Sequence, residues 1–209
     1  MTRKRIALLG PPGAGKGTQA KLISDKTGLC HLSTGDILRD EVAHGTEIGR
    51  AAKLHMDRGD LVPDKLIIDM IHERIAKTDG FILDGFPRTV AQAEALLKIT
   101  SLDLMINITL SRAEVIKRLS SRRVCRECGK IYNLLFNPPK IKTRCDLCGG
   151  ELFQRDDDRP EVVDNRYDVY MQATALLVDF YRERGLLREV DGAQPTAMVL
   201  ERIMDLLAL

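Results

Sequence analysis

The sequence predicts an α/β fold in which a mostly parallel five-stranded sheet lies between two layers of helices. Two observations lead to this prediction. Short apolar runs alternate with segments of helical length, which is the pattern of βαβ units. In addition, the first apolar run, residues 6–9, passes through a glycine-rich turn directly into a helical segment. Strand, glycine turn and helix in this order are typical of P-loop proteins, so we expect a three-layer αβα domain of that type.

Five apolar runs are the expected strands of this sheet. They cover residues 6–9, 28–32, 80–83, 104–110 and 187–190. Four further segments are typical of helices and cover residues 17–26, 90–99, 111–120 and 196–207. The third of them begins with a capping pattern, because Ser111 is followed three residues later by Glu114. The apolar spacing of the last segment suits a helix that covers the sheet.

Two segments interrupt this alternation. Residues 33–62 are polar and helical in pattern, whereas residues 121–158 are rich in cysteine, glycine and arginine and contain no obvious core strand. Both are typical of insertions. We therefore expect a core P-loop domain made of residues 1–32, 63–120 and 159–209, with a helical insertion at 33–62 and a second insertion at 121–158.

The composition favours a globular protein and excludes several broad classes. The chain has 209 residues, of which 44% are hydrophobic, and this is enough for a sizeable core. The 32 basic and 30 acidic residues leave a formal charge of +2, which gives no overall signature of nucleic-acid binding. The sequence contains no run of 18 apolar residues, so it predicts no membrane span. The N-terminus leads straight into the first strand rather than into a signal peptide. We expect a cytoplasmic protein.

The glycine turn spans Gly10–Thr18 and predicts a site for a nucleoside triphosphate. Its glycines let successive backbone N–H groups converge on an anion, the N-terminus of the following helix adds partial positive charge, and Lys16 offers an ammonium to the outer phosphates. Gly17 stands where the general motif has Ser or Thr, and the hydroxyl follows one residue later at Thr18. The pattern leaves open whether the loop itself coordinates Mg²⁺.

Four of the five cysteines form two C-x₂-C pairs that predict a metal site. Sixteen residues separate the pairs, and a glycine follows each one, as in the turns of zinc knuckles. The expected ligands of a structural Zn²⁺ are Cys125, Cys128, Cys145 and Cys148. A closed shell of four thiolates leaves no position for substrate, so the metal would stabilise a module too small to form its own core. Cys30 remains as a small core residue.

Arginines are concentrated around the cysteine-rich insertion. Eight of them lie between residues 118 and 166, at Arg118, Arg122, Arg123, Arg126, Arg144, Arg155, Arg159 and Arg166. Arg118 and Arg122 have the i, i+4 spacing of one helical face, and Arg155 and Arg166 flank the acidic run Asp156–Asp158. Because guanidinium groups bind phosphates in a bidentate manner and stay charged when water is excluded, we interpret them as a phosphate clamp.

A strand that ends in a carboxylate adds a second candidate site. The run Gly80–Leu83 leads to Asp84, and a short turn then leads to Arg88. Ligands of nucleotide-binding α/β sheets lie at the carboxyl ends of the strands. Asp84 is thus expected near a hydrated Mg²⁺ on the phosphates, and Arg88 near an anionic second substrate.

Several motifs together cover nearly the whole chain. Besides the glycine loop they are Leu32–Asp36 with Arg39, Gly59–Val62, Asp84–Thr89 with Gln92, Arg122–Cys125, Asn137–Lys140 and Cys148–Leu152. In this combination they resemble the adenylate kinases, specifically the long-lid, zinc-containing bacterial type. The resemblance implies a monomeric ATP:AMP phosphotransferase that reversibly transfers the terminal phosphoryl group of Mg-ATP to AMP, gives two ADP and so maintains adenine nucleotide balance.

The resemblance also assigns the two insertions to two substrates. Residues 33–62 would close over AMP and residues 121–158 would form a lid over ATP. The residues implied for AMP are Thr34, Arg39, Asp60, Leu61, Val62, Gly85, Phe86, Pro87, Arg88, Gln92, Arg155 and Arg166. Gln92 would read the adenine edge. The residues implied for ATP are Gly13, Ala14, Gly15, Lys16, Gly17, Thr18, Arg118, Arg122, Ile131, Tyr132 and Gln194. Gln194 stands where many relatives carry a lysine near the adenine.

Phosphoryl transfer requires in-line placement of two oxygens and neutralisation of the charge that spreads over the moving group. The groups expected to supply both, together with Mg²⁺, are Lys16, Asp84, Arg88, Arg122, Arg155 and Arg166. No general base is needed, because the acceptor is already an anionic phosphate oxygen. Closure of the insertions would exclude water, which would otherwise accept the phosphoryl group.

Two alternatives remain open from the sequence. A UMP or CMP kinase of the same family shares the loop, the Asp-Gly-Phe-Pro-Arg run and the arginines, although Thr34 and the long lid favour AMP. A nucleic-acid-binding zinc protein that uses nucleotide as a switch would also explain the knuckles and arginines. The balanced charge, the acidic run Asp156–Asp158 and the 4% aromatic content argue against this second class and against a nucleic-acid or membrane partner.

Overall fold

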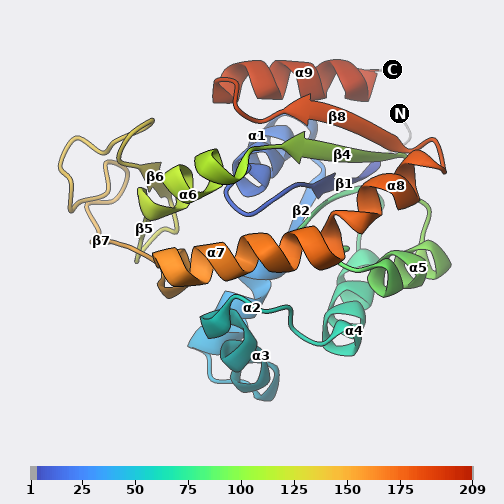
Figure 1. The fold of residues 1–209 in the computed structure, drawn as a ribbon, viewed down its shortest axis with the longest axis horizontal. Coiled ribbons are helices and arrows are strands. Elements are labelled where there is room, and N and C mark those ends of the chain that lie inside the picture. The colour runs from blue at the N-terminus through green and yellow to red at the C-terminus, as the bar shows by residue number, and fades with distance from the viewer. Residues whose placement is uncertain (1–3, 209) are drawn as a thin grey trace.

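The computed structural model describes residues 4–208, and its main sheet is the predicted one. The strands are β1 (Arg5–Leu9), β2 (Cys30–Ser33), β3 (Phe81–Asp84), β4 (Leu104–Thr109) and β8 (Leu187–Asp191). They lie in the order β2-β3-β1-β4-β8, and every neighbouring pair is parallel. Figure 1 shows β1 near the middle of the sheet, so the turn that follows β1 emerges at the centre of its carboxyl edge.

Helices connect these strands. They are α1 (Lys16–Thr27), α2 (Thr34–Ala43), α3 (Glu47–Arg58), α4 (Asp64–Ile75), α5 (Val90–Ile99), α6 (Arg112–Ser120), α7 (Pro160–Val169), α8 (Leu176–Arg182) and α9 (Thr196–Ala208). A π-helical turn, Tyr170–Thr174, joins α7 to α8, so that the chain runs on from one into the other (Figure 1).

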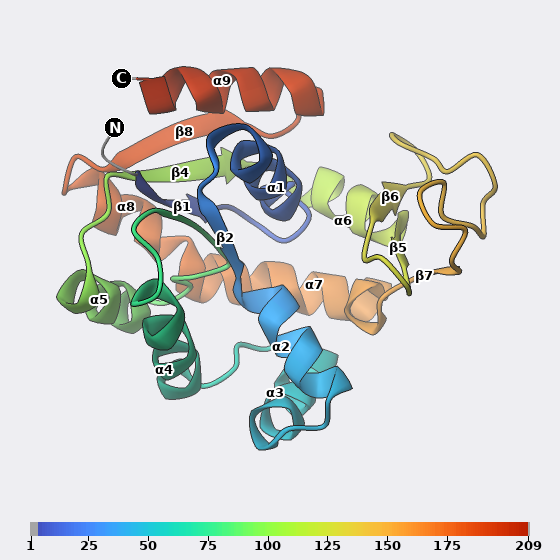
Figure 2. The same ribbon diagram turned by 180° about the vertical axis from the view of Figure 1, so that it is seen from behind.

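The alternation of side chains along β1 explains the three layers. Ile6 and Leu8 point to one face and pack with Ile23 of α1 and Ile203 of α9. Ala7 and Leu9 point to the other face and pack with residues of α4, α5 and α8. Because both faces of the parallel sheet are covered, its three central strands, β3, β1 and β4, are mostly apolar. Seen from behind, α1 and α9 cover the face opposite α8 (Figure 2).

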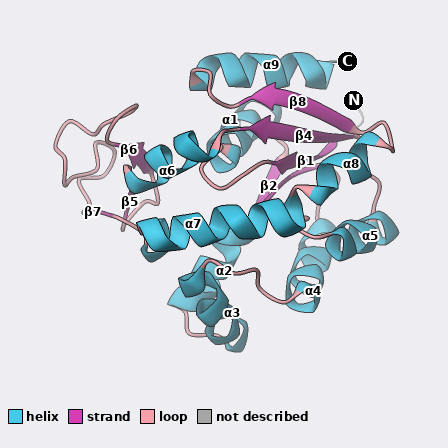
Figure 3. Ribbon diagram, in the orientation of Figure 1, coloured by secondary structure: helices cyan, strands magenta, loops and turns pink. Residues whose placement is uncertain are grey.

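The cysteine-rich insertion forms a separate three-stranded antiparallel sheet. Its strands are β5 (Arg122–Cys125), β6 (Ile131–Asn133) and β7 (Leu152–Phe153), in the order β6-β5-β7. Figure 3 shows these short strands at the end of the molecule toward which β4 and β8 point. The insertion therefore extends from the same side of the main sheet as the carboxyl ends of its strands.

The predicted strands and helices agree with the observed ones to within a few residues at each end. Two helical regions were not predicted, namely α4 and the stretch from α7 to α8. One prediction about side-chain placement was wrong. Arg118 and Arg122 do not share a helical face, because α6 ends at Ser120 and Arg122 begins β5. The Ser121 hydroxyl donates to the Lys117 carbonyl at 2.6 Å, and this closes the helix before the strand pairing starts.

Candidate active site

The glycine loop lies between β1 and α1, where the sequence predicts it. Gly13 and Gly15 have φ angles of 79° and 94°, in the left-handed region that favours glycine, and Lys16 is the first residue of α1. The Lys16 ammonium donates hydrogen bonds to the carbonyls of Gly10, at 2.7 Å, and Pro11, at 2.9 Å. The loop therefore presents the N-terminus of α1 and one ammonium at the carboxyl edge of the sheet.

A cleft opens beside this loop. Its walls come from the loop, α2, the segment 59–62, the turn after β3 and α7. Many of the residues predicted for two substrates line it together, among them Lys16, Thr34, Arg39, Arg88, Gln92 and Arg166. The predicted main-chain segment Asp60–Val62, together with Gly85 and Pro87, also lines the cleft, whereas the Phe86 side chain is fully buried in the core.

Positive charge is crowded in and around this cleft. Burial, opposed by the charge of Asp84 and assisted by the arginines nearby, lowers the pKa of Lys16 to about 7. Burial and the charge of Arg166 lower the pKa of Arg88 to about 10. Burial and two neighbouring guanidinium groups lower the pKa of Arg155 to about 9. Cations that repel each other in a partly dehydrated cleft would be stabilised by a polyanion such as a nucleotide phosphate.

Carboxylates hold the arginines in place. Arg166 donates a hydrogen bond to the Asp157 carbonyl at 2.8 Å and forms an ion pair with Asp157 Oδ2 at 2.8 Å, and Arg155 lies 3.9 Å from Asp36. Arg39 pairs with the same Asp36 carboxylate. The acidic run thus orients Arg166, whereas Asp36 lies against both Arg39 and Arg155. Sequence reasoning gave this run only the role of opposing a nucleic-acid groove.

Asp84 lies at the end of β3, against the phosphate loop. A Cβ atom at Gly17 would approach Asp84 Oδ2 to 3.1 Å, so the absence of a side chain at Gly17 leaves space in front of the carboxylate. His31 Nε2 lies 3.5 Å from the same Oδ2 atom. A carboxylate oxygen next to a phosphate-binding loop is a hard donor that suits a hydrated Mg²⁺. The residues present therefore fit this ion.

The four cysteines come together as the sequence predicts. All four sulfur atoms lie within 4.8 Å of one another. Cys125 and Cys148 approach to 3.4 Å between their sulfur atoms, and Cys128 and Cys145 approach to 3.6 Å. Four thiolates around a tetrahedral Zn²⁺ at about 2.3 Å would be separated by similar distances. The donor set therefore fits a zinc-type metal ion.

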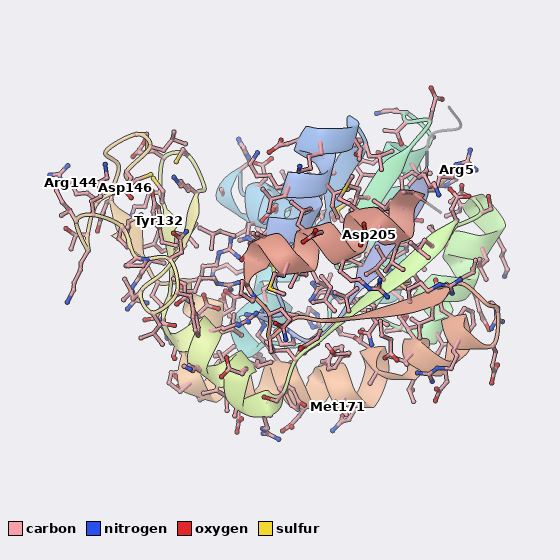
Figure 4. All side chains as sticks on the ribbon, turned by 90° about the horizontal axis from the view of Figure 1, so that it is seen from above. Arg5, Tyr132, Arg144, Asp146, Met171 and Asp205 are labelled. Carbon is pink, nitrogen blue, oxygen red and sulfur yellow. The ribbon has the colours of Figure 1, made fainter. Side chains whose placement is uncertain are left out.

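Of the residues predicted for ATP, only Lys16 is among those that line the cleft, and three of the others have side chains that are engaged or exposed elsewhere. The Tyr132 side chain is buried in the cysteine module, where its hydroxyl lies 3.4 Å from Cys145 Sγ and accepts a hydrogen bond from the Asp146 backbone at 2.8 Å. Figure 4 shows Tyr132 and Asp146 in this module at one end of the molecule. Ile131 is exposed beside it. Gln194 donates to Asp191 at 2.9 Å in an exposed turn after β8.

Two supporting residues were not identified from the sequence. Thr174, in the π-helical turn, donates a hydrogen bond to the Arg88 carbonyl at 2.8 Å. Asp64, at the start of α4, accepts hydrogen bonds from Thr89 and Gln92. All three hydrogen bonds join residues far apart in the chain, so no local pattern could have indicated them. No motif in the sequence between Asp64 and Thr89 indicates that these two residues are in contact.

The fold and the cleft define a nucleotide phosphotransferase of the P-loop class, with a phosphate loop on one side and an arginine-lined second pocket on the other. A comparison with protein families gives the particular family. The model of the family described as adenylate kinase matches residues 8–186. This chain belongs to the adenylate kinase family, whose activity is ATP:AMP phosphotransfer.

Curated relatives cover almost the full length. The chain is 51% identical over 210 residues to an adenylate kinase of Archaeoglobus fulgidus, with 97% of each chain covered. It is 53% identical over 196 residues to an adenylate kinase of Methanocella arvoryzae, covering 90% of this chain and 91% of the relative. An adenylate kinase of Desulfitobacterium hafniense is 50% identical over 209 residues, with 96% of each covered. Similar relatives thus occur in archaea as well as bacteria. Within residues 4–208, no helix combines the length and apolar character needed to span a bilayer.

Proposed function

We propose that this chain transfers the terminal phosphoryl group of Mg-ATP to AMP and the reverse, giving two ADP, and so maintains the balance of adenine nucleotides. One observation carries the proposal beyond family membership. Lys16 of the phosphate loop and Arg88 and Arg166 of the opposite walls line one cleft. A donor and an acceptor phosphate would therefore meet between fixed cations.

The donor half is proposed to be the loop and its neighbours. Backbone N–H groups and the helix N-terminus would hold the ATP phosphates, and Arg118 of α6 and Arg122 of the insertion would add further cations. The full set is Gly13, Ala14, Gly15, Lys16, Gly17, Thr18, Arg118, Arg122, Ile131, Tyr132 and Gln194. Because the Tyr132 side chain is engaged with Cys145, we assign its nucleotide contact to the main chain.

The acceptor half is proposed to lie against α2 and the turn after β3. Arg39, Arg88, Arg155 and Arg166 would bind the AMP phosphate, and Gln92 would contact the base. The remaining residues are Thr34, Asp60, Leu61, Val62, Gly85, Phe86 and Pro87. The Thr34 hydroxyl donates a hydrogen bond to the Gly85 carbonyl at 2.9 Å. This bond joins α2 to the turn after β3 in the wall of the cleft.

The chemistry follows from this placement. Lys16 and the arginines Arg88, Arg122, Arg155 and Arg166 would orient the reacting oxygens in line and neutralise charge on the transferred group. Asp84 would hold Mg²⁺ through its waters, and the ion, when bound, neutralises phosphate charge. The attacking oxygen belongs to a phosphate that is already anionic, so none of these residues has to act as a general base.

The two insertions are proposed to close over the substrates. Residues 33–62 would cover AMP and residues 121–158 would cover ATP, around a core of residues 1–32, 63–120 and 159–209. Closure would remove water that could otherwise accept the phosphoryl group. We propose a structural Zn²⁺ on the four cysteines, and a monomer that acts in the cytoplasm.

A direct assay tests the function. Purified protein is given Mg-ATP with AMP, UMP or CMP, and the diphosphates formed are quantified. We expect AMP to be phosphorylated fastest, and we expect inhibition by a ligand that joins two adenosines through five phosphates, because it would occupy both pockets at once. Faster turnover of UMP or CMP would replace the proposal with a pyrimidine nucleotide kinase.

A further inference from the structure

The side-chain amide of Gln92 is held by two partners of opposite character. Gln92 lies in the first turn of α5, is only 2% exposed and lines the cleft. Its Oε1 atom accepts a hydrogen bond from the Arg88 backbone N–H at 2.8 Å. Its Nε2 atom donates to Asp64 Oδ1 at 2.7 Å. The amide is thus bound at both ends, from the turn before α5 and from the start of α4.

Asp64 is itself fixed. Its second carboxylate oxygen, Oδ2, accepts a hydrogen bond from the Thr89 hydroxyl at 2.9 Å. The same hydroxyl caps α5 by accepting from the Gln92 backbone at 3.2 Å. Asp64, Thr89 and Gln92 therefore form a closed network in which both oxygens of the carboxylate point at α5.

These partners allow only one orientation of the amide. A backbone N–H can only donate and an ionised carboxylate can only accept. Rotating the Gln92 amide by half a turn would place its NH₂ group against the Arg88 N–H and its oxygen against the Asp64 carboxylate. Both contacts would become repulsive in a buried site, so Arg88 and Asp64 together exclude the rotated form.

The fixed amide offers the cleft a donor and an acceptor in a set order. One Nε2–H and one lone pair of Oε1 remain after the two bonds are made. An adenine presents an acceptor at N1 next to a donor at its 6-amino group, and this order matches the fixed amide. A 6-oxo purine presents a donor at N1 and an acceptor at the 6-oxygen, which is the reverse order. A glutamine side chain that could rotate freely would bind both the 6-amino and the 6-oxo purine.

We propose that Asp64 is a positioning residue that makes the acceptor site select a 6-amino base over a 6-oxo base. Asp64 contacts Gln92 rather than the nucleotide, and it acts by preventing the amide from turning. The inference rests on the proposed function in one respect, because it requires that Gln92 contacts the base of the monophosphate.

The test compares AMP with IMP, which differ in the base only at the 6-position and the adjacent N1 proton. Steady-state KM and kcat are measured for both nucleotides in the wild type and in Asp64→Ala. We expect the KM for AMP to rise about tenfold with a much smaller change in kcat, because an orienting, charge-assisted hydrogen bond is lost. We expect the ratio of kcat/KM for AMP to that for IMP to fall by at least about tenfold.

Two matched variants separate positioning from a structural effect. Asp64→Asn removes the same charge from the start of α4, but its Oδ1 can still accept from Gln92 and its Nδ2 can donate to Thr89, so the preference for AMP should be retained. Asp69→Ala removes an exposed acidic residue of the same helix and should leave both the KM for AMP and the AMP-to-IMP ratio of kcat/KM unchanged. If Asp64→Ala does not fold, Asp64→Ser supplies a small polar residue at the helix start and is expected to show the same loss of selectivity.

Gln92→Ala distinguishes failure of this inference from failure of the proposed function. If Gln92→Ala leaves the KM for AMP unchanged, Gln92 does not contact the base and the proposed acceptor site is wrong. If Gln92→Ala raises that KM but neither Asp64→Ala nor Asp64→Ser lowers the AMP-to-IMP ratio, the acceptor site stands and the role of Asp64 is overturned. Loss of selectivity in Asp64→Asn equal to that in Asp64→Ala would also overturn it.

Discussion

The Arg122 guanidinium holds the fully buried carboxylate of Asp158 through two hydrogen bonds, of 2.7 Å from Nε and 2.5 Å from Nη2. Arg122 belongs to β5 of the cysteine-rich insertion, whereas Asp158 lies just before α7 of the core. Arg166 of α7 also reaches the same carboxylate, at 3.5 Å. Asp158 therefore connects one arginine of the insertion with one arginine of the cleft.

Replacing Asp158 by asparagine should strongly destabilise the protein. The change keeps the size of the side chain but removes the negative charge that faces Arg122 and Arg166. The buried guanidinium group of Arg122 then loses its carboxylate partner. We expect the free energy of unfolding to fall by about 3 kcal/mol, as is typical when one partner of a buried ion pair is removed. Urea denaturation of the ligand-free protein measures this loss.

Asp156→Asn is the matched control for that substitution. Asp156 lies two residues away and pairs with Arg159 at 2.5 Å, but its side chain is 71% exposed. An exposed ion pair contributes at most about 1 kcal/mol, so this variant should unfold almost like the wild type. Equal stability of the two variants would contradict a special role for the buried pair.

Lys16 should take up a proton when nucleotide binds. Its pKa is lowered to about 7 in the ligand-free protein, so most of the side chain is neutral at pH 8.5. A bound polyphosphate adds negative charge and raises the pKa, and the ammonium then regains its proton. Calorimetry of ATP binding at pH 8.5 in two buffers with different heats of ionisation should reveal proton uptake, and Lys16→Met should abolish it. Identical heats in both buffers would contradict the lowered pKa.

The same pKa makes a prediction for stability. The folded value, about 7, lies below the ordinary value of 10.5, so the unfolded chain binds the proton more tightly. Charged Lys16 therefore destabilises the ligand-free fold fully below about pH 7, and this penalty disappears as the pH rises toward 10.5. Relative to Lys16→Met, the wild type should gain stability between pH 7 and 10, as measured by denaturation at a series of pH values. A constant difference would argue against the linkage.

Much of the fold could be predicted because its signals are local. The central strands of the main sheet are buried on both faces and appear as short apolar runs, and the spacing of the cysteines identifies their cluster. The missed helix α4 does place Ile67, Met70, Ile71 and Ile75 on one buried face. Its start at Pro63 lacks a side-chain cap, and charged residues interrupt its apolar stripe, so the signal was weak.

The site was predicted less completely because its geometry depends on contacts across the chain. Arg122 and Asp158 are 36 residues apart, and nothing in either neighbourhood indicates their pairing. Helical spacing assigned Arg122 to the same face as Arg118. In the structure the helix ends at Ser120, and Arg122 lies in β5, which pairs with β6. Residue types at the cleft could thus be predicted from motifs, whereas the carboxylates that orient them required the tertiary structure.

Arg88→Ala should impair phosphoryl transfer without unfolding the chain. Arg88 lines the cleft and is held by a hydrogen bond from Nε to the Gly85 carbonyl at 2.8 Å. Loss of one preorganised charge at the transferred group typically lowers kcat by about 10²–10³-fold. Because Arg166 repels Arg88 in the ligand-free cleft, we expect the stability to be unchanged or slightly higher. Initial rates and thermal melts measure both effects.

Arg112→Ala serves as the control for Arg88→Ala. Arg112 lies on α6, pairs with Asp164 at 2.8 Å and is 44% exposed, so its removal should leave turnover near that of the wild type. Near-normal turnover of Arg88→Ala would exclude Arg88 from the transfer site. Unfolding of Arg88→Ala would assign it a structural role instead.

Replacing Cys125 and Cys128 together by serine should remove the metal and weaken the insertion. Only four buried residues, Cys125, Tyr132, Cys145 and Leu152, form the apolar cluster of this module, which is too few to hold it without a metal. We expect one zinc ion per wild-type chain by elemental analysis, none in the double variant, and a lower melting temperature. Turnover should fall less than in Arg88→Ala, because the four cysteines lie outside the lining of the cleft.

Cys30→Ala controls for the loss of a thiol as such. Cys30 begins β2 and lies outside the cluster of four sulfur atoms, so this variant should keep its zinc. A chelator should lower the melting temperature of the wild type and of Cys30→Ala, but not that of the double variant, because binding to the folded state alone stabilises it. A double variant that melts like the wild type would show that the module folds without the metal. The four thiols would then not explain how this insertion keeps its shape.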